Sequence, residues 1–467
     1  MPVRLQTRTP HGRGGSLLPA YVQSATPRRW FKAGNGLTAI DPKDNPAINP
    51  VYPNPPPWRG TNNTIAGIFS YSGGGMNPDA PTFHQWGGGH GDSGNNGVYA
   101  LDLNMSEPTW RHERKPAGSI GNWDGTTEYV WDGLDSVQDT YNNGEPRSAH
   151  TYNGVCCAAG KIYVTQGYKA GLGGVNGQTL FAYNLTTRAW ETVSALPGGG
   201  AISRDMCYDS LRNRLCLIGG GNGPITFYNI ATGAWTQTSS ETSTSQGARM
   251  IYIPELDCIV GLNHNIVGAN GFFAHDFGRT ALTGGVKEYQ PATTGTNPLL
   301  PNRGEWAAST AYSVGDRAFP VATMTNWPAK ILRCTTAGTS GSNNALTVPA
   351  IGATLTDGGV TWTVDPHPDL RNGVWVPGIG KIVGWSWGAN LWTLTPPASG
   401  LISGTWTWGA IAADVGNTLT PTGRPGSQDP ETFGRLFHWR VGSVDMIGLS
   451  LFEESINTEL KPYFFRL

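Results

Sequence analysis

The sequence is poor in charged residues. Only 14% of its 467 residues are charged, and 32 basic residues stand against 33 acidic ones, a formal net charge of −1. A protein that follows nucleic-acid phosphates carries a basic surplus, so this balance excludes nucleic acid as the expected partner. No apolar run approaches the roughly 20 residues that a membrane helix requires, so membrane insertion is not expected either.

The N-terminal residues also lack the apolar stretch of about 7–15 residues that a secretory signal peptide contains. We therefore expect no signal peptide and synthesis in the cytoplasm of the producing cell. The cysteines show no CxxC spacing, which argues against a structural zinc site. Several lie in apolar, strand-like stretches, where a thiol behaves as a small core residue, so we expect buried free thiols. The six are Cys156, Cys157, Cys207, Cys216, Cys258 and Cys334.

Glycine, proline and aromatic residues are abundant instead. The chain contains 65 Gly, 34 Pro, 18 Trp and 16 Tyr. Intrinsically disordered chains are charge-rich and aromatic-poor, and collagen needs glycine at every third residue, so neither class fits. The composition predicts a large, rigid and turn-rich β protein.

A short motif recurs along the chain. An Arg opens a segment, an aromatic residue follows, and a turn then leads into a second apolar run, as in RDMCYDSLRNRLCLIGGG from residue 204. The second run begins 10 to 15 residues after each Arg, which is the spacing of a hairpin. The opening residues are Arg147, Arg204, Arg249, Arg371 and Arg435.

Two further strand-like segments follow some of these hairpins and end near a tryptophan: Trp110, Trp190 and Trp235. Four strands in about 40–50 residues are typical of a β-propeller blade. Six blades fit, and seven remain possible; the fourth lacks a closing tryptophan. The last is too short for four strands, and the segment around Trp30 is expected to supply its outer strand. The six are expected to start near Thr64, Arg147, Arg204, Arg249, Arg371 and Arg435.

The first of these units resembles the kelch repeats of the galactose-oxidase central domain. The matching features are the Gly-Gly-Gly at 87–89, the Tyr99-x-x-Asp102 pair and the closing Trp110. The resemblance implies an all-β, six-bladed, kelch-like β-propeller, and leaves function open because propellers host many activities. We expect an extension at 1–24, the propeller at 25–303 and 367–467, and a small inserted β domain at 304–366.

The expected insert begins with W-x-A-S-T-x-Y-x-x-G-D and is similar to small chitin-binding-type carbohydrate modules and to bacteriophage tail and fibre repeats. Sugar binding by such a module needs flat aromatic faces. The candidates are Trp306, Tyr312, Trp327 and Trp362. The alternative is that three of these rings, all but Trp327, form the core of the insert. Its TDGGVTW segment predicts a tight hairpin turn at the Asp-Gly.

The five repeated arginines allow two interpretations. If the first strand of each blade lines the channel, their guanidinium groups would surround one mouth and bind a carboxylate or sulfate, as in recognition of an acidic sugar. Alternatively, each Arg ties neighbouring blades by bonding loop carbonyls or an Asp. The repetition favours the second interpretation, because a binding site normally breaks the symmetry.

Signals for catalysis are weaker. The loop 122–145 holds five candidate carboxylates beside aromatic residues, as a glycoside-hydrolase subsite does, but its sequence leaves their separation undefined. These are Asp124, Glu128, Asp132, Asp135 and Asp139. His84, His90 and Asp92 have metal-ligand types, yet their glycine-rich setting favours a solvated turn. No Cys–Tyr pair matches the copper-radical pattern, so we expect no catalytic residue, metal or cofactor.

Two functional classes remain. The first is a structural and interaction protein of a bacteriophage virion, in the tail, fibre or head–tail region, with other virion proteins, further copies of itself and host surface polysaccharide as partners. The second is a carbohydrate-active enzyme or lectin with a functional propeller face. The missing signal peptide, the low charge and the likeness of the insert to tail proteins favour the first.

Overall fold

The fold is all-β, as expected. A computed structural model describes residues 18–40, 65–69, 71–88, 95–114, 139–141, 144–169, 176–198, 204–219, 221–237, 242–244, 249–262, 272–276, 291–295, 303–326, 330–366, 372–386, 388–421, 432–451 and 460–467. In these residues the helical segments are short: α1 (Ala20–Ser24) and the 3-10 turns η1 (Leu37–Ile40) and η2 (Ile65–Phe69).

Most strands belong to antiparallel sheets, numbered here in chain order. Sheet I contains β2 (Gly74–Met76), β3 (Thr82–Gln85), β4 (Val98–Asp102) and β5 (Thr109–Arg114). Sheet II contains β6 (Val155–Ala158), β7 (Lys161–Thr165), β8 (Thr179–Asn184) and β9 (Ala189–Ala195). Sheet III contains β10 (Arg204–Asp209), β11 (Arg214–Gly219), β13 (Thr226–Asn229) and β14 (Trp235–Gln237).

The next sheets continue this order. Sheet IV contains β16 (Arg249–Ile253), β17 (Cys258–Leu262) and β18 (Phe272–Asp276). Sheet V contains β26 (Val374–Val376), β27 (Lys381–Trp385), β28 (Leu391–Thr395) and β29 (Trp406–Ile411), with β19 (Thr293–Thr294) added in parallel to β29. Sheet VI contains β30 (Leu436–Val441), β31 (Val444–Leu449), β32 (Tyr463–Arg466) and β1 (Trp30–Lys32). A small pair is formed by β12 (Gly221–Gly223) and β15 (Thr242–Thr244).

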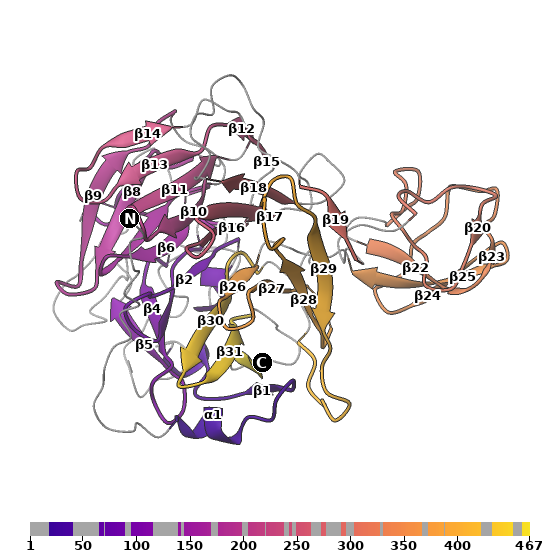
Figure 1. Ribbon diagram of the computed structural model, residues 1–467, viewed down its shortest axis with the longest axis horizontal. Coiled ribbons are helices and arrows are strands. Elements are labelled where there is room, and N and C mark those ends of the chain that lie inside the picture. The colour runs from indigo at the N-terminus through magenta and orange to yellow at the C-terminus, as the bar shows by residue number, and fades with distance from the viewer. Residues whose placement is uncertain are drawn as a thin grey trace.

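The first strands of sheets I to VI contact one another in a closed cycle. Strand β2 contacts β6, β6 contacts β10, β10 contacts β16, β16 contacts β26, β26 contacts β30, and β30 contacts β2 again. Figure 1 shows the sheets arranged around this ring. An all-β chain of antiparallel sheets arranged in this way is consistent with a β-propeller.

Each pair of neighbouring sheets in this cycle shares one apolar cluster. Along β11, Leu215 and Leu217 face the cluster shared with sheet II, whereas Cys216 and Ile218 face the cluster shared with sheet IV. Successive side chains of a strand point to opposite faces, so a strand buried on both faces needs an uninterrupted apolar run. All six cysteines are free and buried, which confirms the prediction of core thiols.

Tight turns join the first and second strands of several sheets. In sheet II, Ala158 pairs with Lys161 across two residues, Ala159 and Gly160, whose φ angles are 48° and 72°. Two consecutive residues at positive φ give the type I′ turn that matches the twist of a hairpin.

The expected closing strand is present. Strand β1 pairs with β32, with Trp30 opposite Phe465. The Trp30 indole donates to the carbonyl of Ala389 at 2.7 Å, and Arg29 forms an ion pair with Asp414 at 2.7 Å. These contacts tie the strand to sheets V and VI, which confirms the prediction for the segment around Trp30.

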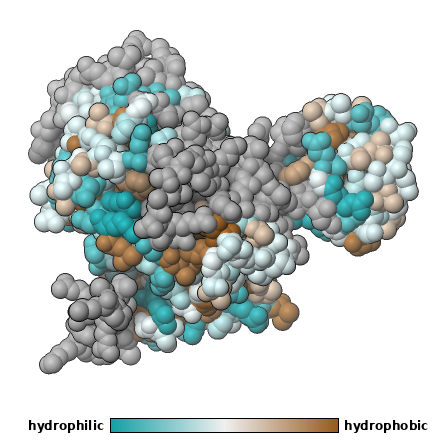
Figure 2. All heavy atoms as spheres, turned by 45° about the horizontal axis from the view of Figure 1, so that its top comes forward, coloured by the Kyte–Doolittle hydropathy of each residue, from teal (hydrophilic) through white to brown (hydrophobic). Residues whose placement is uncertain are grey.

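Residues 303–366 form a separate lobe beside the ring (Figures 1 and 2). Its sheet VII contains β21 (Arg317–Ala318), β22 (Lys330–Thr336), β25 (Val360–Pro366) and β24 (Thr354–Asp357), and a second pair is β20 (Ala311–Tyr312) with β23 (Gly338–Thr339). Asp357 pairs with Val360 across Gly358, whose φ is 62°, so the predicted Asp-Gly hairpin is confirmed. This lobe has its own apolar core.

Candidate functional site

The front face is defined here as the end of the ring at which the first strand of each sheet begins. Loops between the second and third strands return to the same end, as shown in sheet II by the hydrogen bond from the His150 amide to the Tyr168 carbonyl. Loops positioned by a rigid scaffold carry a disproportionate share of binding residues. The described members of the repeated arginines, Arg147, Arg204, Arg249 and Arg435, also lie at this end, because each precedes or opens a first strand.

The described arginines point into the joints between sheets. Arg249 donates through Nε to the Gly373 carbonyl at 3.1 Å, and Arg435 donates through Nη1 to the Phe69 carbonyl at 2.7 Å. Each of these carbonyls lies just before the first strand of the next sheet in the cycle. Arg204 donates through Nη2 to the Pro197 carbonyl at 2.7 Å, in the loop that leaves sheet II.

Of the two interpretations of the repeated arginines, the favoured one holds for these three: their guanidinium groups bond backbone carbonyls of adjacent segments, and the alternative of an anion-binding ring is wrong for them. Burial lowers the pKa of Arg204 and of Arg249, as expected for cations enclosed between sheets. Arg147 is fully buried, with its guanidinium 4.8 Å from the centre of the Tyr141 ring. Arg371 lies outside the described residues.

The aromatic rings proposed for sugar stacking in the lobe are mostly core residues. Trp306, Tyr312 and Trp362 are 4%, 3% and 0% exposed, and Tyr312 packs edge-on against Trp362. Asp357 accepts from the indoles of both tryptophans, at 2.8 and 3.2 Å. Because no ring face is open to a ligand, the glycan-binding expectation is wrong for these three. Trp327 lies outside the described residues.

Of the five candidate carboxylates of loop 122–145, Asp139 lies within the described residues, and it holds the loop in place. Asp139 binds the buried Lys169 at 2.7 Å and also accepts from the Thr179 hydroxyl and the Gln178 amide. Burial opposes ionisation, but these hydrogen bonds hold the pKa of Asp139 below its usual value. The other four, Asp124, Glu128, Asp132 and Asp135, lie outside the described residues.

The histidine considered as a metal ligand is buried in sheet I. His84 is 2% exposed, and burial, with a smaller effect of Arg111, lowers its pKa to about 3. His90 and Asp92 lie outside the described residues. Within the described ranges, no group of three or more His, Cys, Asp or Glu side chains is placed to hold a metal ion. In the same ranges, no helix has the length and apolar character to cross a membrane.

An aromatic cluster on the front face was not anticipated from the sequence. It consists of Tyr71, His150, Tyr152, Tyr168 and Phe433, which come from the segments before β2, β6 and β30 and from the loop after β7. The Tyr71 ring lies 4.7 Å from His150, 6.0 Å from Tyr152 and 6.1 Å from Phe433, centre to centre.

The rings of this cluster differ in exposure. Tyr71 is 37% exposed, whereas His150, Tyr152 and Phe433 are 4%, 7% and 1% exposed. One ring therefore faces solvent on a base of buried rings. The sequence signal is faint, because the contributing segments lie up to 362 residues apart, from Tyr71 to Phe433.

No family model matches the chain, and no curated protein matches it. Among solved structures, a crystal structure of TolB from Acinetobacter baumannii aligns at 13% sequence identity with a TM-score of 0.27. The alignment covers 63% of this chain and 55% of the TolB chain, so the chain spans about half the length of that protein. A likeness at this score carries no argument about fold or function.

Proposed function

We propose that this chain is a structural and interaction protein of a bacteriophage virion, located in the tail, fibre or head–tail region. In this proposal sheets I to VI are the blades of a six-bladed, kelch-like propeller that acts as a rigid platform. Residues 304–366 are a small inserted module that the platform presents. The partners are other virion proteins, further copies of the chain and host surface polysaccharide.

The observation that carries this proposal is the combination of a closed ring with a projecting lobe. The cycle of first strands and the strand pair β1–β32 tie the ring together. The lobe has a core of its own and leaves the ring beside β19, at the outer edge of sheet V. A rigid ring that holds a separate module away from itself suits attachment better than it suits an enclosed reaction.

The chemistry of the sequence supports the same proposal. A low content of charged residues together with many glycines and tryptophans suits a protein built into an assembly, and the lobe resembles tail and fibre repeats. No cofactor is needed for such a role.

The test is direct detection in particles. Virions purified from a culture of the producing bacterium are digested and searched for peptides of this chain, and intact particles are labelled with gold-conjugated antibody against it. We expect its peptides in every particle preparation and label at one end of the particle. Peptides confined to the particle-free supernatant would contradict the proposal.

A lectin or carbohydrate-active enzyme is the second candidate, and the aromatic cluster with the exposed Tyr71 is the observation that favours sugar binding. Incubation of the full chain with a panel of polysaccharides, followed by measurement of new reducing ends, separates the two classes. We expect no release of sugar. Release at a rate that scales with protein concentration would replace the structural role with an enzymatic one.

A further inference from the structure

Two bulky residues of the front-face cluster adopt a strained backbone. Tyr71 and Tyr152 have φ angles of 45° and 50°, a region that large side chains rarely occupy. The Tyr152 amide donates to the Tyr71 carbonyl at 2.7 Å, so the two strained residues hold each other. Strain of this kind persists where the surroundings enforce it, and it gathers at ligand sites.

The surroundings do enforce it, because three segments meet here at close range. A Cβ on Gly73 would lie 2.3 Å from the Tyr152 carbonyl oxygen and 2.6 Å from that of Phe433, so only glycine fits. The Gly73 amide also donates to the Thr151 hydroxyl at 2.9 Å. The Tyr71 ring is thus displayed on a fixed backbone and needs little further ordering to bind a ligand.

We propose that the Tyr71 ring and the rings packed behind it form a binding site for the apolar face of a neutral hexopyranose. The proposal rests on the proposed function, since it places the host glycan on the front face of the ring. The π face of tyrosine is complementary to the C–H groups on one side of a pyranose. Tyr168 is half-buried beside this cluster, with its ring 6.3 Å from that of His150.

The charges beside the cluster favour a neutral sugar over an acidic one. Lys169, next to Tyr168, is paired with Asp139 at 2.7 Å and is 3% exposed along its side chain. Its charge is therefore compensated within the protein. The described residues 176–178 of that loop are Asn, Gly and Gln and carry no charge. An acidic sugar would therefore find no surplus cation among the described residues of this loop.

The substitution Tyr71→Gly gives a sharp test, because it removes the ring and relieves the backbone strain at the same position. The full chain and its variants are titrated with hexasaccharides of glucose, mannose and N-acetylglucosamine and with sialyllactose, by calorimetry and saturation-transfer NMR. We expect at least one neutral probe to bind, and binding to weaken by about tenfold or more in Tyr71→Gly, the loss of one aromatic stack. Tyr71→Phe should retain most of the affinity.

The control is Leu211→Gly, which removes an exposed apolar side chain of 44% exposure in a turn of sheet III. It should bind like the unmodified chain, and all variants should unfold at similar denaturant concentrations. The site would be overturned if binding persisted in Tyr71→Gly, if only sialyllactose bound, or if no probe bound. It would also be overturned if the loss of Tyr71 abolished self-association. Particle labelling is independent of these titrations, so failure of the site is distinguishable from failure of the virion role.

Discussion

At the scale of single residues, His84 shows how sheet I buries a polar side chain. It pairs with Gly75 on β2 and with Ala100 on β4, so the imidazole fills space that two small residues leave on that face. Among the described residues, neither ring nitrogen has a hydrogen-bond partner, and burial lowers the pKa of His84 to about 3. The ring is therefore neutral in the folded chain at any pH well above 3.

This arrangement predicts acid sensitivity. The folded pKa lies below the unfolded value of about 6.5, so the unfolded chain binds the proton first, and stability falls as pH drops from about 6.5 toward 3. Between pH 7 and pH 5 this single group should cost about 2 kcal/mol of unfolding free energy. His84→Leu should remove that part of the slope, as measured by urea unfolding at both pH values; identical slopes in the two proteins would contradict the assignment.

The residues of the candidate sites differ in how far the sequence predicts their role. Trp306, Tyr312 and Trp362 fit a sugar platform as well as the core that the sequence favoured for them, since both need large rings. Tyr71 gives no pattern at all, because its importance comes from a positive φ and from neighbours in two other sheets. Only the folded arrangement distinguishes such positions.

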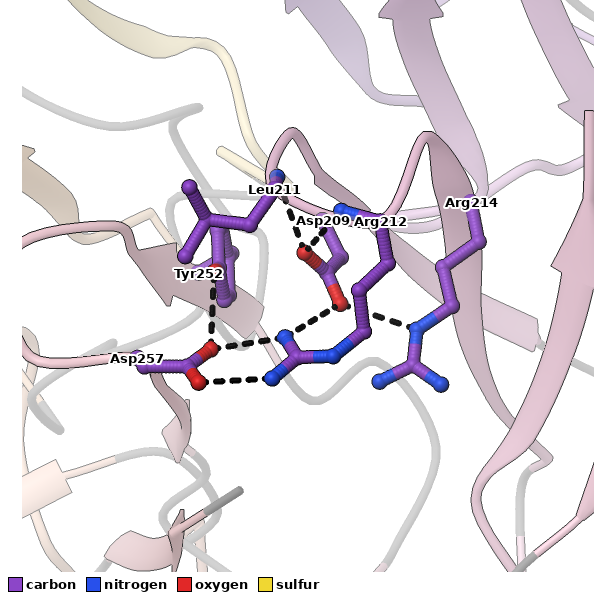
Figure 3. Close-up of polar contacts among 6 residues, drawn as sticks. All are labelled: Asp209, Leu211, Arg212, Arg214, Tyr252 and Asp257. Atoms are coloured by element: carbon purple, nitrogen blue, oxygen red, sulfur yellow. Dashed lines mark hydrogen bonds and ion pairs between the residues drawn. The ribbon is translucent and has the colours of Figure 1, made fainter. Parts of the chain in front are cut away.

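At the scale of strands and turns, an ion-pair network links sheets III and IV (Figure 3). Asp209 is fully buried; it accepts from the amides of Leu211 and Arg212 and pairs with the side chains of Arg212 and Arg214. Arg212 extends onward to Asp257 of the neighbouring hairpin, making bonds of 2.7 and 2.6 Å to its two oxygens.

The two acids of this network should differ in their effect on stability. Asp209→Ala leaves two amides and a partly buried arginine without their acceptor, so we expect a loss of about 3 kcal/mol. Asp257→Ala breaks a pair whose members are 36% and 32% exposed and removes the acceptor of the Tyr252 hydroxyl; screening of the pair by water should limit the loss to about 1 kcal/mol. Urea unfolding midpoints of the two variants provide the comparison, and equal losses would contradict it.

Strands and hairpins were the most predictable elements. Uninterrupted apolar runs such as 215–218 predict strands buried on both faces, and the Asp-Gly at 357–358 predicts its turn, because these signals are local. The direction of the arginine side chains was less predictable. A guanidinium at the start of a strand can point toward the axis of the ring or toward the next sheet. Arg249 and Arg435 point toward the next sheet, because they bond the carbonyls of Gly373 and Phe69.

At the scale of the whole molecule, stability depends on closing the cycle. Each sheet has two apolar faces, and an open row of sheets, unlike a closed ring, would leave one apolar face exposed to solvent at each end. Pairing of β1 with β32 completes sheet VI, and the buried Trp30 packs there against Phe465 at 5.1 Å. The closing strand was predictable from a tryptophan placed as in the other units.

Removing the Trp30 indole should loosen the pairing of β1 with β32 before the rest of the chain unfolds. Trp30→Ala deletes a side chain of 3% exposure, and we expect a loss of about 3–5 kcal/mol and faster hydrogen exchange at the amides of 463–466. Trp235→Ala, on the outer strand of sheet III, is the matched control and should leave exchange at 463–466 unchanged. Protection at 463–466 that is equal in both variants would show that the strand does not secure the ring.

The antiparallel pairing of β1 and β32 also determines how the ring bears mechanical load. Trp30 lies opposite Phe465 and Lys32 opposite Tyr463, so the start of β1 and the end of β32 are at the same end of the pair. Tension applied through the segments outside this pair would separate its hydrogen bonds one after another, as in unzipping, instead of shearing them together. The ring is thus suited to forces that act on its faces and loops, and it yields easily to a pull along the chain.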